Sequence, residues 1–169
     1  MPYEDLLPCN ILYNLRANLD QDVKIFTPLK KQKVTINLRS HTKNQSGSIE
    51  LKTPRGWNVT GSNSFQFKFA DEEQKIIFEI TPASNAETGF AEVYINGRLA
   101  KGFRPIAYDH ISSQLWFPDA KMKLVSLDLN IPPKKIGYLM GAGDKVGDAL
   151  LNLGYELDFL DPEKLDEAT

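Results

Sequence analysis

Apolar side chains recur at every second position through most of the first hundred residues, in short runs separated by Gly, Pro, Asn and Ser. In one run, Val34, Ile36 and Leu38 alternate with polar neighbours. A period of two places the apolar side chains of a strand on one face, so each run predicts a strand with one buried face. The runs that follow this pattern are residues 11–15, 23–26, 34–38, 48–52, 65–69, 76–80, 91–95 and 101–106.

About eight strands at roughly 10-residue spacing are typical of a β-sandwich. We therefore predict a mainly-β chain that begins with an Ig-like antiparallel β-sandwich over residues 1–106. The Asn96-Gly97 pair suits the two central positions of a type I′ hairpin turn, which both need positive φ. We expect this turn to bring residues 101–106 back antiparallel beside residues 91–95.

The alternation is lost after residue 106, and residues 107–133 are predicted to form a connector with one strand at 125–129 before Pro132-Pro133. Residues 134–169 have a different pattern. An apolar run at 134–140 has the length of a strand, and Val146, Ala149, Leu150 and Leu153 then follow at helical spacing. Gly154 is placed to end this helix, and residues 155–160 form a second apolar run.

A strand, a helix and a strand within about 30 residues predict a βαβ unit with two parallel strands. One helix cannot cover both faces of the strands, so this segment is expected to be an incomplete, partial α/β unit. We expect its apolar strands to pair with those of a second copy, as a homodimer through residues 134–169, or to fold back on the sandwich.

The charge and cysteine content exclude several classes of protein. Lys and Arg number 20 against 22 Asp and Glu, for a net charge of −2, so the sequence predicts neither a nucleic-acid nor a membrane partner. Cys9 is the single cysteine, so an intrachain disulfide and a Cys-rich zinc site are both excluded. The opening residues lack the pattern of a secretory signal, and the sequence assigns no location to the chain.

Candidate chemistry is sparse, and we assign no catalytic residue, metal ligand or cofactor. His41 and His110 are the two histidines, and neither has a metal-ligand spacing, so both are interpreted as structural or exposed. Cys9 lies in an alternating stretch and is interpreted as a small buried hydrophobe.

Gly141-Ala142-Gly143, after a strand and before a helix, begins a dinucleotide-binding fingerprint. Val146 stands where the third glycine is needed for close helix packing, although Gly147 follows at once. Asp144 would also repel a phosphate. A tight turn is therefore the favoured interpretation, and a nucleotide-binding enzyme fragment is the weaker alternative.

Exposed aromatic rings on a β-sandwich can stack on sugars. Of the three candidates, Trp57 lies at the beginning of a strand and is assigned to the core, whereas Tyr94 lies within a strand. Trp116 lies in the connector, where it either packs between the two parts of the chain or stays available to a ligand. Trp116 is therefore the one candidate glycan-contact residue.

Several stretches together resemble the regions that follow the catalytic domain in large bacterial PIG-L-type (LmbE-like) N-acetylglucosaminyl deacetylases. These stretches are Gly56-Trp57-Asn58-Val59, Phe78-Glu79-Ile80-Thr81-Pro82, Tyr108-Asp109-His110-Ile111, Phe117-Pro118, Leu124 through Leu129 and Lys135 through Asp144. The resemblance implies an Ig-like accessory module, then a connector, then the beginning of a glutamine-amidotransferase-like domain. The family's His-Pro-Asp-Asp zinc motif is absent, because His41 is followed by Thr42 and His110 by Ile111.

The resemblance implies that the chain is an internal piece of a longer, exported bacterial protein that acts on acetylated amino sugars or related glycans. We therefore predict a non-catalytic accessory or spacer module whose partner is the parent's deacetylase domain. The alternative function is a carbohydrate-binding module that uses Trp116.

Overall fold

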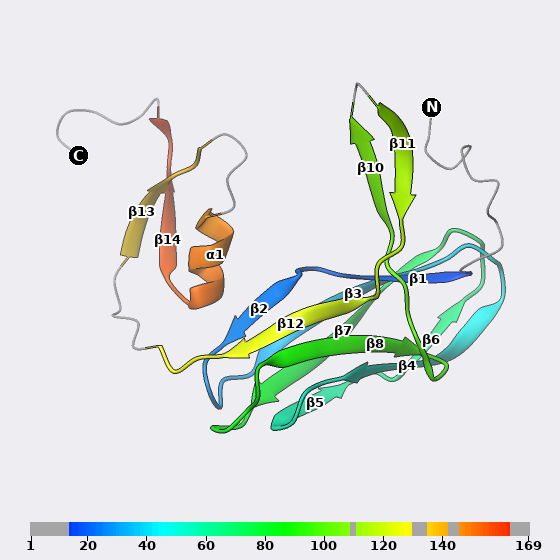
Figure 1. Ribbon diagram of the computed structural model, residues 1–169, viewed down its shortest axis with the longest axis horizontal. Coiled ribbons are helices and arrows are strands. Elements are labelled where there is room, and N and C mark those ends of the chain that lie inside the picture. The colour runs from blue at the N-terminus through cyan, green and yellow to red at the C-terminus, as the bar shows by residue number, and fades with distance from the viewer. Residues whose placement is uncertain (1–13, 109–110, 130–134, 142–145, 163–169) are drawn as a thin grey trace.

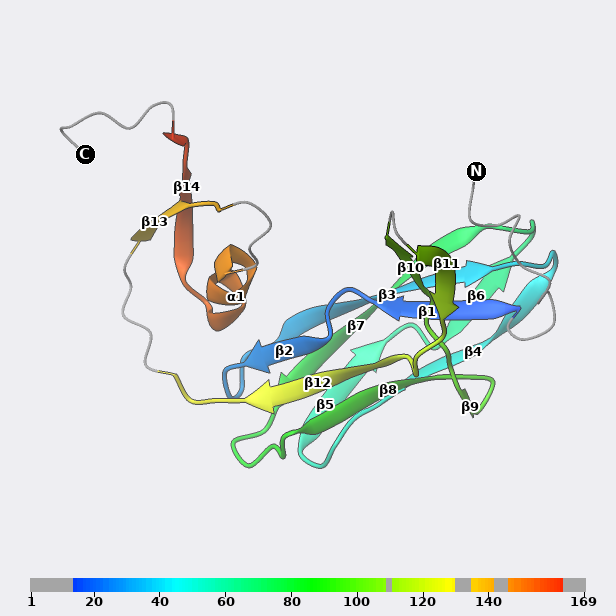
Figure 2. The same cartoon turned by 45° about the horizontal axis from the view of Figure 1, so that its top comes forward.

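Two β-sheets packed face to face form the body of the protein in the computed structural model (Figure 1). The structure describes residues 14–108, 111–129, 135–141 and 146–162. The predicted mainly-β, sandwich-like fold is confirmed. A hairpin projects from the sandwich, and a small βαβ unit follows it in the chain (Figure 2).

The first sheet is antiparallel throughout, and the second contains one parallel pair. The first has the order β1 (Leu15–Leu19), β3 (Gln32–Ser40), β7 (Glu73–Pro82) and β5 (Trp57–Gly61). The second has the order β2 (Val23–Phe26), β12 (Lys121–Ser126), β8 (Gly89–Ile95), β4 (Gln45–Lys52) and β6 (Ser64–Phe67), with β9 (Arg98–Leu99) also beside β8. β2 and β12 form the parallel pair, which joins an early strand to a late one.

The predicted alternation produces the core. Val34, Ile36 and Leu38 on β3 are fully buried, and their polar neighbours point away from the second sheet. From the second sheet, Phe26 packs edge-on against Trp57, with ring centroids 5.0 Å apart and planes at 82°. Edge-to-face contact suits the quadrupoles of the two rings. Because Phe26 is on β2 and Trp57 is on β5, this pair joins the two sheets.

The turn at Asn96-Gly97 is confirmed, but the strand predicted beside residues 91–95 at 101–106 is wrong, because the strand that returns there is β9 at Arg98–Leu99. Asn96 and Gly97 have φ of 50° and 76°, as a type I′ turn requires. The returning strand β9 is short, and Gly102 donates its backbone N–H to the carbonyl of Pro118 instead of continuing the ladder with β8. The chain leaves the sheet there, so residues 104–106 belong to a different hairpin.

That hairpin consists of β10 (Arg104–Tyr108) and β11 (Ile111–Trp116), which pair antiparallel in the stretch where a connector was predicted. The strand expected at 125–129 is also displaced, because β12 ends at Ser126. The apolar alternation changes phase between Leu124 and Val125, and Met122 and Leu124, not Val125 and Leu127, are the fully buried pair. A shift of one residue exchanges the two faces of a strand, which explains the error.

Two further differences concern the first sheet. Of the strand expected at 11–15, only Leu15 belongs to an observed strand, β1, and residues 11–13 lie outside the described part of the chain. β5 was expected only from Trp57, which was placed at the beginning of a strand, and it was not among the alternating runs because only Trp57 and Val59 give it an apolar face.

The predicted βαβ unit is present as β13 (Lys135–Leu139), α1 (Val146–Leu153) and β14 (Glu156–Leu160), with the two strands parallel. Gly154 ends the helix with φ of 95°, and the N–H groups of Gly154 and Tyr155 donate to the carbonyls of Leu151 and Leu150. These two bonds form a Schellman cap.

Gly147 allows the helix to lie close to both strands. A Cβ at this position would stand 3.1 Å from the ring of Tyr138 and 3.3 Å from that of Phe159. The glycine therefore has the close-packing role that the fingerprint assigns to its third glycine, one position later than expected. Leu139 on β13 remains 47% exposed, and the expected pairing with a second copy stays a prediction.

The core can be tested with two isoleucines on β7, Ile80, which is fully buried, and Ile77, which is 46% exposed on the opposite face. Ile80→Ala is expected to lower the free energy of unfolding by about 2–5 kcal/mol, through lost burial and the cavity that remains. Ile77→Ala should cost less than about 1 kcal/mol. Urea unfolding of both variants measures the difference, and equal losses would contradict the assignment of the two faces.

Candidate functional site

A groove opens where the β10–β11 hairpin leaves the sandwich, with a volume of about 530 Å³. We call it the Trp116 groove, and its lining comes from four separate parts of the chain. The lining residues are Asp22, Phe90, Lys101, Arg104, Trp116, Phe117, Pro118, Asp119 and Lys121. Its volume lies within the range of small-molecule binding sites.

Trp116 is the last residue of β11 and is 51% exposed. The hairpin register places it directly opposite Arg104, the first residue of β10. The guanidinium carbon of Arg104 lies 5.7 Å from the centroid of the indole ring, within the range of a cation–π contact. The predicted glycan-contact residue therefore lies at the surface, in a groove, and beside a cation.

Arg104 is held from the other side by Asp22, which precedes β2. One guanidinium nitrogen donates to Oδ2 of Asp22 at 3.1 Å, and the other forms an ion pair with Oδ1. The hydrogen bonds to Asp22 raise the pKa of Arg104, so the guanidinium stays charged. Both side chains are partly exposed, so this bidentate pair contributes more to geometry than to stability.

A second ion pair crosses the groove between Lys101 and Asp119, with 2.6 Å between Nζ and Oδ1. The hydrogen bond from Lys101 is the main cause that lowers the pKa of the Asp119 carboxyl, and the charge of Lys121 lowers it further. The two side chains are about one third exposed. Asp119 is therefore ionised at neutral pH, with two lysines near it.

Phe90 and Lys121 form the wall of the groove on the second sheet. Phe90 is 51% exposed, and Nζ of Lys121 lies 4.9 Å from the centroid of its ring. The ammonium group therefore remains near the protein surface beside an aromatic ring, where a ligand in the groove can reach it.

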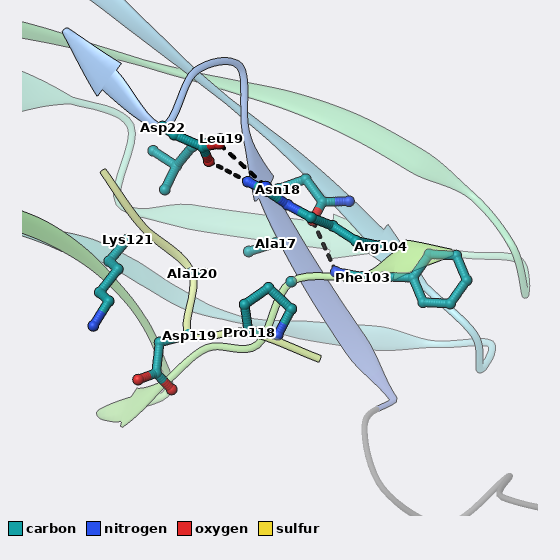
Figure 3. A pocket seen from close by; sticks show the side chains of 11 residues that line it. Ala17, Asn18, Leu19, Asp22, Phe103, Arg104, Pro118, Asp119, Ala120 and Lys121 are labelled. Carbon is teal, nitrogen blue, oxygen red and sulfur yellow. Dashed lines mark hydrogen bonds and ion pairs between the residues drawn. The ribbon is translucent and has the colours of Figure 1, made fainter. Parts of the chain in front are cut away.

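Beneath the groove, a smaller cavity of about 240 Å³ marks the attachment of the hairpin to β1 (Figure 3). Asn18 accepts the backbone N–H of Phe103 at 2.9 Å, and a Cβ on Gly102 would come within 2.8 Å of the same amide oxygen. Arg16 lies over the ring of Phe103, 4.3 Å from its centroid, and Phe103 packs on Phe117 with centroids 5.8 Å apart. These contacts fix the base of the hairpin on the outer face of the first sheet.

The other candidates from the sequence lie away from the groove. Trp57 is 8% exposed and donates its indole N–H to the carbonyl of Glu87 at 2.7 Å, so its assignment to the core is confirmed. Tyr94 is partly buried on β8, with Nζ of Lys52 4.0 Å from its ring centroid.

His41 is partly buried at the end of β3, and its Nδ1 donates to Asp71 at 2.9 Å. Burial and the charge of Arg16 lower the pKa of His41 more than Asp71 raises it. Arg39 also contacts the same Asp71 carboxylate oxygen, at 3.4 Å. The site is a local charge cluster, and His41 lines neither the Trp116 groove nor the smaller cavity at the base of the hairpin.

Cys9, His110, Ala142, Gly143 and Asp144 lie outside the described residues. Within the described ranges, no group of three or more His, Cys, Asp or Glu side chains has an arrangement that could hold a metal ion. In the same ranges, no helix has the length and apolar character needed to cross a membrane.

A larger hollow of about 790 Å³ lies between β4 and β5. Leu51, Trp57 and Phe78 line it, and all three belong to the buried core. It is therefore an opening between the edges of the two sheets, and its charged lining residues Glu50 and Lys52 form no ion pair with any residue that the structure describes. The Trp116 groove is the better candidate because it combines exposed aromatic rings with fixed charged groups.

The sequence could identify Trp116 but not the residues that surround it. Asp22 and Arg104 are 82 positions apart and are brought together because the chain before the hairpin bonds to Ala17 and Asn18 on β1. No local pattern indicates such a pair, because each residue taken alone resembles an ordinary charged surface residue.

The lowered pKa of His41 predicts how stability changes with pH. The unfolded chain takes up this proton near its ordinary pKa of 6.5, before the folded protein does, so the free energy of unfolding should fall as the pH drops below about 6.5. His41→Asn should flatten this slope between about pH 7 and pH 5. The lowered pKa of Asp119 acts below this window, and equal slopes in both proteins by urea unfolding would contradict the prediction.

Comparison with known proteins assigns no family to this chain. No protein-family model matches the sequence. No curated protein matches it either. The function is therefore argued from the groove and its chemistry.

Proposed function

We propose that the chain is a carbohydrate-binding β-sandwich module whose ligand occupies the Trp116 groove. The observation that carries this proposal is the half-exposed indole of Trp116 in a groove of about 530 Å³, beside the bidentate pair of Arg104 and Asp22. The C–H faces of a sugar ring pack on an aromatic face, and charged planar groups bond its hydroxyls.

The polar groups of the groove suit a ligand with many hydroxyls. A carboxylate only accepts hydrogen bonds, whereas guanidinium and ammonium groups only donate them. The pairs Asp22 with Arg104 and Lys101 with Asp119 each place a donor beside an acceptor. Neighbouring hydroxyls on a sugar need this alternation, because each hydroxyl both donates and accepts.

The contacts among these charged groups also preorganise the groove for binding. Asp22 fixes the guanidinium of Arg104 over Trp116, so less side-chain freedom is lost when a ligand arrives. The Asn18 bond to Phe103 holds the hairpin backbone on which both residues stand. The side chains of the groove are therefore already ordered before a sugar binds.

We propose as a second role that the module serves a longer PIG-L-type deacetylase as a non-catalytic accessory part. The arrangement that supports this role is the parallel β13–α1–β14 unit after the sandwich, in the order that the resemblance implies. In this role the groove would hold a glycan near the catalytic domain. The gene sequence on both sides of this segment tests the role, because an upstream His-Pro-Asp-Asp motif would support it and a flanking sequence without one would overturn it.

Glycan binding can be measured through the two tryptophans of the chain. Trp57 is buried and hydrogen-bonded, so a change of fluorescence on titration with oligosaccharides should come from Trp116. Trp116→Ala is expected to weaken binding by at least about tenfold, because it removes the stacking surface. Calorimetry provides the affinity of this variant, which has lost the reporting side chain.

The matched control is Phe69→Ala, which removes an aromatic ring that is 71% exposed and is not part of the groove lining. Its affinity should equal that of the unmodified chain, and thermal unfolding should show that both variants are folded. If no oligosaccharide in a broad panel binds, or if both variants bind equally well, the carbohydrate proposal is wrong.

A further inference from the structure

The net charge of the Trp116 groove is opposite in sign to the net charge of the whole chain. The lining contains three cations, Lys101, Arg104 and Lys121, and two carboxylates, Asp22 and Asp119, so the groove carries a net charge of +1. The whole chain carries −2. A positive groove on a negative protein indicates a ligand with a negative charge, because charge complementarity is a property of the binding surface and not of the whole molecule.

Two of the three cations have carboxylate partners within the groove. Asp22 binds Arg104 through both of its oxygens, and Asp119 binds Lys101 at 2.6 Å. These pairs are locally neutral, and an incoming anion would compete with a carboxylate already in place. Neither pair therefore supplies the extra positive charge.

Lys121 supplies it. Its ammonium group lies against the ring of Phe90, and the described part of the structure shows no carboxylate within ion-pair distance of it. Glu92 is opposite Lys121 in the β8–β12 register, but its carboxylate accepts a hydrogen bond from the hydroxyl of Tyr94 at 3.3 Å. The charge of Lys121 acts on Asp119, but that carboxylate already pairs with Lys101.

We infer that the Trp116 groove selects a glycan that carries a carboxylate, of the uronic acid type, whose carboxylate is bound at Lys121. This inference rests on the proposed carbohydrate binding and names the class of sugar. A uronic acid has its carboxylate attached directly to the ring, so one oligosaccharide offers both an apolar ring face for Trp116 and an anion for Lys121. Arg104 and Asp22 remain available for its hydroxyls.

The test compares two ligands of equal length, an oligogalacturonate and its fully methyl-esterified form, in which a methyl group removes the charge of each carboxylate, by calorimetry with the full chain. The free acid is expected to bind about fivefold tighter, since an exposed charge pair contributes up to that factor. This preference should decrease as NaCl is raised, because salt screens exposed charges.

Lys121→Gln should lower the affinity for the free acid to that for the ester and leave the ester affinity unchanged. The matched control is Lys75→Gln, which makes the same charge change on an exposed position of β7, outside the groove. It should retain the preference, and thermal unfolding of both variants should show that they are folded.

Equal binding of acid and ester, with binding still dependent on Trp116, would overturn the inference and leave the carbohydrate proposal standing. Failure of both ligands in a panel where no neutral oligosaccharide binds would overturn both. Competition by single-stranded DNA at the same concentration of charge as the oligogalacturonate would also overturn the inference, since it would show a general anion surface.

Discussion

The burial of one face of each sheet against the other is the constraint on which the rest of this structure depends. Val34, Ile36 and Leu38 from the first sheet and Met122 and Leu124 from the second are fully buried in one continuous core. Because strand side chains alternate, burying these residues also decides which side chains face outward. Lys121 is exposed for this reason, since it adjoins Met122 on β12.

The same constraint explains why the groove lies at the base of the hairpin. After β9 the backbone leaves the second sheet, and its N–H groups still need partners. Gly102 donates its N–H to the carbonyl of Pro118, and Phe103 donates its N–H to the side-chain oxygen of Asn18. The crossing chain thus has to pass close to β1, and the hollow beside it becomes a groove lined by residues of the second sheet, of the hairpin and of the segments that connect them.

The groove and the core use aromatic rings in opposite ways. Trp57 is buried, packs edge-on against Phe26 and has its indole N–H satisfied by a backbone carbonyl, so it has no capacity left for a ligand. Trp116 contacts a guanidinium and keeps half of its surface exposed. A ring at the end of a projecting hairpin cannot be covered by the opposite sheet, and its remaining surface is available for stacking.

The βαβ unit shows how a helix can be fitted to two strands by a single residue. Gly147 brings α1 close to Tyr138 and Phe159, whose rings lie edge to face with centroids 6.0 Å apart. The helix covers only the face of the strands that carries these rings. Leu139, on the other face, is left largely exposed, which is consistent with a unit that needs a further element to complete it.

The local pattern of the sequence alone determined the sandwich-like body, the turn at Asn96-Gly97, the parallel βαβ unit and the end of its helix at Gly154. Each depends on interactions within a few residues: the period of two, the positive φ of the turn, the helical spacing and the left-handed cap. The prediction failed at β12, because the apolar alternation changes phase between Leu124 and Val125 and most of the observed strand lies before that change.

Tertiary structure alone decided the hairpin at 104–116 and the groove. β9 ends early because Gly102 and Phe103 donate their N–H groups to distant partners instead of to β8. The local sequence pattern does not indicate these distant partners. Trp116 could be singled out as an aromatic residue in a connector, but its exposure depends on what the rest of the chain leaves uncovered. Asp22 and Arg104 meet only because Lys101 and Phe103 bond to Ala17 and Asn18 on β1. Their pairing is therefore a property of the fold and has no local signal in the sequence.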